Sequence, residues 1–178
     1  RPAASGWESL PAQQRPASNL VFLIDVSGSM QPAERLPLLK EGMRLLVQQL
    51  TANDRVTVVT YAGTTGVALR PTRGDQKDVI LSLIDSLQAG GSTNGASGIQ
   101  LAYEQSTASF IPNGVNRVIL ATDGDFNVGI TDRNALLRLI EDKAKSGVFL
   151  SVLGVGMGNY KDATLEMLAD KGNGNYEY

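Results

Sequence analysis

Three nearly unbroken apolar runs are the feature that most restricts the fold of this chain. They are Asn19–Asp25 (NLVFLID), Val115–Thr122 (VNRVILAT) and Val148–Val155 (VFLSVLGV). Successive side chains of a strand point to opposite faces, so such a run is typical of a strand that is covered on both faces. We therefore expect these three strands to be parallel and central in one sheet.

Shorter strand candidates and amphipathic segments separate these runs. The other strand candidates are Arg55–Tyr61, Val67–Arg70 and Asn175–Tyr178. Five apolar stripes with helical spacing lie between the strands: Leu39, Met43, Leu46 and Leu50; Ile80, Leu83, Ile84 and Leu87; Ile99, Ala102, Tyr103 and Phe110; Leu136, Ile140 and Ala144; Leu165, Leu168 and Ala169. Gly147 and Gly172 are the expected ends of the last two helices.

This alternation predicts an α/β fold, a doubly wound (Rossmann-like), mainly parallel six-stranded sheet with helices on both faces. Val67–Arg70 follows Arg55–Tyr61 after the short turn AGTTG, which leaves no room for a crossover helix. We therefore expect it to form a hairpin and one antiparallel edge strand.

Length and composition fit one domain. Residues 1–18 carry three prolines and no periodicity and are interpreted as a linker or lead-in, whereas 19–178 is expected to be a domain excised from a longer protein. With 42% apolar and 19% charged residues the chain is typical of a globular domain, and no apolar run reaches the roughly 20 residues of a membrane span. The net charge of −2 gives no electrostatic reason to expect nucleic acid.

The chain has neither histidine nor cysteine. The Ser-His-Asp triad, thiolate nucleophiles, disulfides and the usual zinc sites are therefore excluded. A metal ion would have to be bound by oxygen atoms alone, which favours Mg²⁺ and leaves Ca²⁺ and Mn²⁺ as alternatives.

Oxygen-bearing residues gather where three segments should meet at one sheet edge. They are Asp25, Ser27 and Ser29 after the first strand, Thr93 in GGST, and Asp123 after the fourth strand. Each of them alone is more simply interpreted as a capping or turn residue. Residues 25, 27 and 29 alternate, however, so that a turn at Gly28 would curl them around one point. The combination favours a divalent-cation site.

These residues resemble the metal-ion-dependent adhesion site of von Willebrand factor type A domains. The similarity extends from Asn19 to the end and is closest to a bacterial, often envelope-associated branch, although the fragment itself does not reveal its location. The resemblance implies hydroxyl ligands from Ser27, Ser29 and Thr93, with Asp25 and Asp123 binding directly or through water. It also implies an open position for a partner's Asp or Glu, and thus a role in adhesion or protein–protein interaction.

Several functions compete at this stage. The preferred one is a non-enzymatic, cation-dependent protein-binding module. A Mg²⁺-dependent phosphohydrolase with Asp25 as nucleophile would need a second acid two residues later, where Ser27 stands. A nucleotide-binding Rossmann domain would need a glycine-rich turn after the first strand, and DVSGSM has one glycine. A scaffold with a purely structural metal remains open, as do the partner, the resident metal and the oligomeric state.

Overall fold

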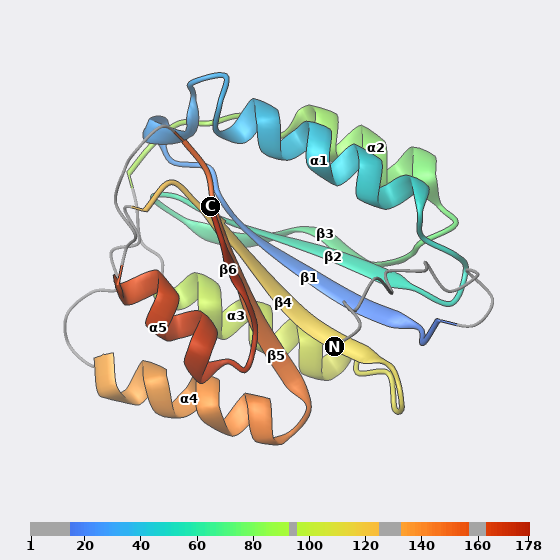
Figure 1. Ribbon diagram of the computed structural model, residues 1–178. Helices are drawn as coiled ribbons and strands as arrows, with labels where there is room; N and C mark the ends of the chain where they lie inside the picture. The colour runs from blue at the N-terminus through green and yellow to red at the C-terminus, as the bar shows by residue number, and fades with distance from the viewer. Residues whose placement is uncertain (1–14, 93–95, 125–132, 157–162) are drawn as a thin grey trace, which may run out of the picture.

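One sheet organises the part of the chain that the computed structural model describes, residues 15–92, 96–124, 133–156 and 163–178. Its six strands have the order β3-β2-β1-β4-β5-β6 (Figure 1). The strands are β1 (Ser18–Asp25), β2 (Arg55–Tyr61), β3 (Thr65–Arg73), β4 (Val115–Thr122), β5 (Val148–Gly154) and β6 (Tyr176–Glu177). This is the doubly wound, mainly parallel sheet that the sequence predicted.

β1 is the central strand. It pairs in parallel with β2 on one side and with β4 on the other, and every residue from Asn19 to Asp25 is buried. β5 and β6 continue the parallel pairing, whereas β3 pairs antiparallel with β2 at the opposite edge. The central position of the apolar runs and the antiparallel edge strand are thus confirmed. The strand order reverses between β1 and β4, which is where doubly wound sheets bind ligands.

Helices cover both faces of the sheet (Figure 1). α1 (Leu36–Gln48) and α2 (Lys77–Ser86) pack on one face, around Phe22, Ile24 and Val58. α3 (Ala96–Ala108), α4 (Arg133–Lys145) and α5 (Ala163–Lys171) pack on the other, around Leu23 and Leu120. Within the described ranges, no helix is long and apolar enough to cross a bilayer.

The element boundaries differ from the prediction in a few places. β3 was expected at Val67–Arg70 but runs from Thr65 to Arg73, because backbone pairing with β2 continues through polar residues. Phe110 was assigned to the third helix but lies beyond its end and is 38% exposed. β1 begins one residue early, at Ser18, and β5 and β6 are shorter than expected. Gly147, at φ +92°, follows the end of α4 as predicted.

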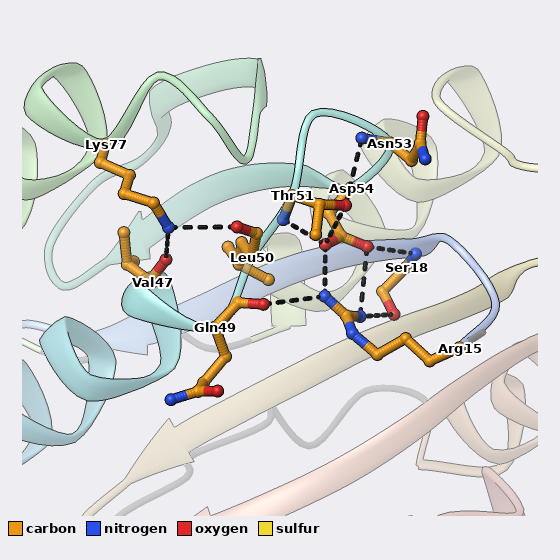
Figure 2. A network of polar contacts seen from close by, with 9 residues as sticks. All are labelled: Arg15, Ser18, Val47, Gln49, Leu50, Thr51, Asn53, Asp54 and Lys77. Atoms are coloured by element: carbon orange, nitrogen blue, oxygen red, sulfur yellow. Dashed lines mark hydrogen bonds and ion pairs between the residues drawn. The ribbon is translucent and has the colours of Figure 1, made fainter. Parts of the chain in front are cut away.

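A polar cluster at the amino ends of β1 and β2 joins the start of the described chain to the sheet (Figure 2). Asp54, which is fully buried, accepts hydrogen bonds from the N–H groups of Ser18 and Thr51 and forms an ion pair with Arg15. Burial raises the pKa of Asp54, but these N–H bonds and the guanidinium outweigh it and lower that pKa. Nearby, Lys77 caps the end of α1 by donating to the carbonyl oxygens of Val47 and Leu50. This end of the sheet is therefore held by charges that the chain itself supplies.

Candidate functional site

The two predicted carboxylate ligands lie at the carboxyl ends of β1 and β4. Asp25 is the last residue of β1, and Asp123 directly follows β4. The register places Ile24 beside Ala121, so both strands end at the same level. This is the point where the strand order reverses, as the sequence predicted for the site.

Asp25 is a buried carboxylate held by neutral donors. It has no exposed surface, and its Oδ1 accepts the backbone N–H of Ser27 at 2.9 Å. Its Oδ2 accepts the hydroxyl of Thr122 at 3.2 Å. Burial raises the pKa of Asp25, and the negative charge of Asp123 raises it further, while the bonds from Ser27 and Thr122 lower it in part. The net effect is a raised pKa, so a positive charge here would stabilise the ionised form.

Ser27 and Ser29 are brought together by a short turn of 3₁₀ helix, Gly28–Met30. Ser27 precedes this turn in an extended conformation, and its Oγ lies 3.0 Å from the Oγ of Ser29. Met30 has no exposed surface and anchors the turn in the core beside α1. The turn at Gly28 thus brings the hydroxyls of Ser27 and Ser29 together, whereas the convergence of both with Asp25 on one ion stays a prediction.

The loop that leads to Thr93 lies against this turn. Gly28 donates its N–H to the carbonyl of Gly91, and Gly90 donates to the carbonyl of Val26. Gly91 has φ +86°, a conformation that favours glycine at the point where the two loops meet. Thr93 itself lies outside the described residues, so its role as a ligand stays a prediction.

Asp123 is paired with Arg35, which the sequence analysis did not identify. The Nη1 of Arg35 donates to Asp123 Oδ2 at 2.8 Å and to the carbonyl oxygen of Ser29 at 2.7 Å. The Asp123 side chain is 1% exposed, and that of Arg35 is 28% exposed. Arg35 stands just before α1, six residues after Ser29, and no local pattern indicates that it turns back to the site.

Tyr61 is a second residue that sequence reasoning missed. It is the last residue of β2 and pairs with Asp25 in the parallel register. Its side chain has no exposed surface, and burial, followed by the charge of Asp25, raises the pKa of its hydroxyl. The signal was available, because the last residue of a strand beside β1 must lie at this edge. Tyr61 therefore lies next to Asp25 at this edge of the sheet.

The donor set fits an oxygen-binding divalent cation. Two buried carboxylates and two hydroxyls meet here, and all are hard oxygen donors of the kind that Mg²⁺, Ca²⁺ and Mn²⁺ accept. The described part of the chain contains no group of three or more acidic side chains placed to hold a metal ion. A cation here would therefore depend on hydroxyls as well as on carboxylates, and the predicted ligand set stays a prediction.

Comparison with known proteins gives the same architecture. The model of the von Willebrand factor type A domain matches residues 19–178. The Escherichia coli (strain K12) protein YfbK is 52% identical over 167 residues, which cover 94% of this chain and 29% of YfbK. Inter-alpha-trypsin inhibitor heavy chain H1 of Sus scrofa is 27% identical over 150 residues, 78% of this chain and 16% of that protein. The chain thus spans less than a third of these curated relatives.

Solved structures with low sequence identity share the fold. A von Willebrand factor type A protein from Catenulispora acidiphila superposes with a TM-score of 0.75 at 21% identity, covering 90% of this chain and 38% of that one. The conserved hypothetical protein BatB from Bacteroides thetaiotaomicron superposes with a TM-score of 0.71 at 20% identity, covering 90% and 89%. At these identities the likeness concerns the fold alone.

Proposed function

The chain belongs to the von Willebrand factor type A domain family, and on that premise we propose that it is a protein-binding module whose binding depends on a divalent cation. Asp25, Ser27, Ser29, Thr93 and Asp123 would hold the ion, with Mg²⁺ as the preferred occupant. The ion would offer one coordination position to an Asp or Glu side chain of a protein partner. The module is proposed to be non-enzymatic.

One observation supports this proposal above the others. The side chains of Asp25 and Asp123 are both buried at the ends of adjacent strands, and Ser27 and Thr122, which donate hydrogen bonds to Asp25, are neutral groups. Burying two carboxylates together is costly unless positive charge accompanies them. The single guanidinium of Arg35 balances one of the two. A divalent cation would supply the remaining positive charge and use the two serine hydroxyls as further ligands.

The proposed partner chemistry follows from the mixture of ligands. Hydroxyls are neutral, so a cation held partly by Ser27, Ser29 and Thr93 keeps more of its positive charge than one held by carboxylates alone. An ion of this kind attracts a further carboxylate. We therefore propose an acidic side chain on the partner, and, from the resemblance to envelope-associated bacterial members, a location in the cell envelope.

The structure offers a specific argument against the phosphohydrolase alternative. A nucleophilic aspartate must reach its substrate, whereas Asp25 is fully buried and both of its oxygens accept hydrogen bonds. Ser27 occupies the position where such enzymes usually place a second acid, and its hydroxyl cannot act as the general acid at neutral pH. The other alternative, a scaffold with a purely structural metal, is separated from the proposed function by the experiment below.

The experiment measures cation binding and partner capture with the same variants. Isothermal titration with Mg²⁺ compares the wild type with Asp25→Ala and Asp25→Asn, and Asp85→Ala serves as a control that removes an exposed carboxylate of α2. Immobilised protein then captures partners from source lysate with Mg²⁺ or with EDTA. We expect partners that are lost with EDTA and with both Asp25 variants, but retained by Asp85→Ala. Circular dichroism verifies that each variant is folded.

Two results would contradict the proposal in different ways. If Mg²⁺ does not bind to the folded wild type, the cation site is wrong. If Mg²⁺ binds but capture is the same with EDTA, the metal is structural and the scaffold alternative holds.

A further inference from the structure

Among the ion pairs that the described residues form, one lies at this site, and its basic partner is Arg35. It contacts Asp123 Oδ2 and the carbonyl oxygen of Ser29 through the same nitrogen, Nη1. It therefore joins the segment after β4 to the turn after β1. The two serine hydroxyls remain in contact with each other rather than with the guanidinium.

The backbone around Arg35 leaves a channel for its side chain. Gly156, which follows β5, has φ +116°, and a Cβ added there would lie 2.9 Å from Arg35 Nε and 3.5 Å from its Cγ. A larger residue at position 156 would push the arginine aside. The Oη of Tyr178 donates to the carbonyl of Gly156 at 2.7 Å and fixes this segment. The position of Arg35 is therefore shaped by the fold.

The position of Arg35 beside Asp123 changes the net charge of the site. With Asp25 and Asp123 ionised, Arg35 leaves one net negative charge, so a divalent cation would leave one net positive charge. Without Arg35 the same cation would be neutralised completely. We propose that Arg35 is a built-in counter-charge that weakens the hold on the divalent cation and strengthens the attraction for an acidic partner group. Arg35 is thus a positioning and charge-setting residue rather than a ligand.

This inference rests on the proposed function, because it presupposes a cation and an acidic ligand. It differs from a simpler alternative in which Arg35 merely stands in for the cation and leaves when the cation binds. In that case, removal of Arg35 would tighten cation binding and leave carboxylate binding unchanged. A true counter-charge affects the two affinities in opposite directions.

The test uses Mn²⁺ as the cation and acetate as the acidic group. Titration calorimetry measures the Mn²⁺ affinity, and water-proton relaxation of the Mn²⁺-loaded protein measures acetate binding through loss of coordinated water. The variants are Arg35→Gln, which removes the charge, and Arg35→Lys, which keeps it. Arg44→Gln is the matched control, because Arg44 lies on α1 but pairs with the exposed Asp85.

We expect Arg35→Gln to bind Mn²⁺ about tenfold more tightly and acetate about tenfold more weakly, which is the size of effect that one nearby charge produces. Arg35→Lys and Arg44→Gln should stay close to the wild type in both titrations. Sodium chloride at the same ionic strength as the acetate controls for screening.

Each other outcome overturns the inference. If Arg35→Gln weakens both affinities, Arg35 is a structural support; if it leaves acetate binding unchanged, Arg35 is only a stand-in for the cation. If Arg35→Lys behaves like Arg35→Gln, geometry rather than charge matters. If the folded wild type does not bind Mn²⁺, the proposed function fails together with the inference, whereas the other outcomes leave the proposed function intact.

Discussion

The hydroxyl of Thr122 donates a hydrogen bond of 3.2 Å to Asp25, although the two residues are 97 positions apart in the sequence. The bond joins the end of β4 to the end of β1, where the order of the strands reverses. It also fixes Asp25 beside the segment that carries Asp123, so the two negative charges cannot easily separate. The two carboxylates are therefore held in a position that suits a cation, and their repulsion destabilises the fold when the cation is absent.

We predict that Asp25→Asn stabilises the protein in EDTA at pH 7, by about 1 kcal/mol. The buried carboxylate has a raised pKa, so its charged form is less stable in the fold than in the unfolded chain, and the amide removes that charge. The wild type in EDTA should lose stability as the pH rises from the ordinary pKa of 3.8 to the raised one, whereas the variant should not. Thermal melting across pH measures this. A lower melting temperature for Asp25→Asn in EDTA would contradict it.

We predict that Mg²⁺ raises the melting temperature of the wild type relative to EDTA. Binding to the folded state alone should contribute about 2.7 kcal/mol when the Mg²⁺ concentration is one hundred times the dissociation constant. Asp123→Ala should lose this difference, and Asp85→Ala should keep it, because Asp85 is exposed on α2. Identical wild-type melting curves with and without Mg²⁺ would exclude the proposed site.

We predict that Thr93→Ala lowers the Mg²⁺ affinity at least about tenfold while leaving the melting temperature in EDTA unchanged. The substitution would remove a neutral ligand and leave both carboxylates, so we expect its effect on the metal to exceed its effect on the fold. Ser92→Ala, one residue earlier in the sequence and at an exposed position, is the control. Equal Mg²⁺ affinity for wild type and Thr93→Ala would remove Thr93 from the ligand set.

We predict that the protein does not hydrolyse phosphate esters. In the presence of Mg²⁺, release of phosphate from a generic aryl phosphate should be no faster with wild type than with Asp25→Asn, because Asp25 is buried and no paired acid stands at position 27. Turnover by the wild type that the variant abolishes would show that the enzyme alternative is right.

We predict that Asp54→Ala destabilises the fold by about 3 kcal/mol, since it leaves the N–H groups of Ser18 and Thr51 without their acceptor and Arg15 without its partner. The pKa of Asp54 is lowered in the fold, so its contribution is present above the ordinary value of 3.8 and is lost as the pH falls through the lowered one. Urea unfolding at several pH values measures both effects. Asp75→Ala, in an exposed pair with Arg73, should change stability by less than about 0.5 kcal/mol.

The sheet could be predicted from the sequence because a strand that is buried on both faces requires a continuous run of apolar residues. The run from Leu20 to Ile24 is apolar throughout, and only a central strand can bury such a run on both faces. The full length of β3 could not be predicted in the same way, since its ends are exposed and are held by backbone bonds that any residue makes. Phe110 has the spacing of a helical residue, but the chain leaves the helix before reaching it.

The candidate site was predictable only as far as strand ends can be located. Asp25 and Asp123 each follow an apolar run, and parallel strands bring both to one edge. Arg35 is different, because its contact with Asp123 joins residues 88 positions apart through a side chain whose direction depends on Gly156. No local periodicity records a contact of that kind. Tyr61 is an intermediate case: it was not predicted, but pairing the end of β2 with the end of β1 would have placed it beside Asp25.

The position of the Asp54 cluster has a practical consequence for protein engineering. It holds the amino ends of β1 and β2, whereas the candidate site lies at the carboxyl ends, about 25 Å away along a strand of this length. Substitutions more than about 10 Å apart usually have additive effects on stability. Exposed positions of the loops around Ser27 and Gly91 can therefore be varied in a display library for new binding specificities without disturbing the Asp54 cluster, provided that Met30 and Gly91 are kept.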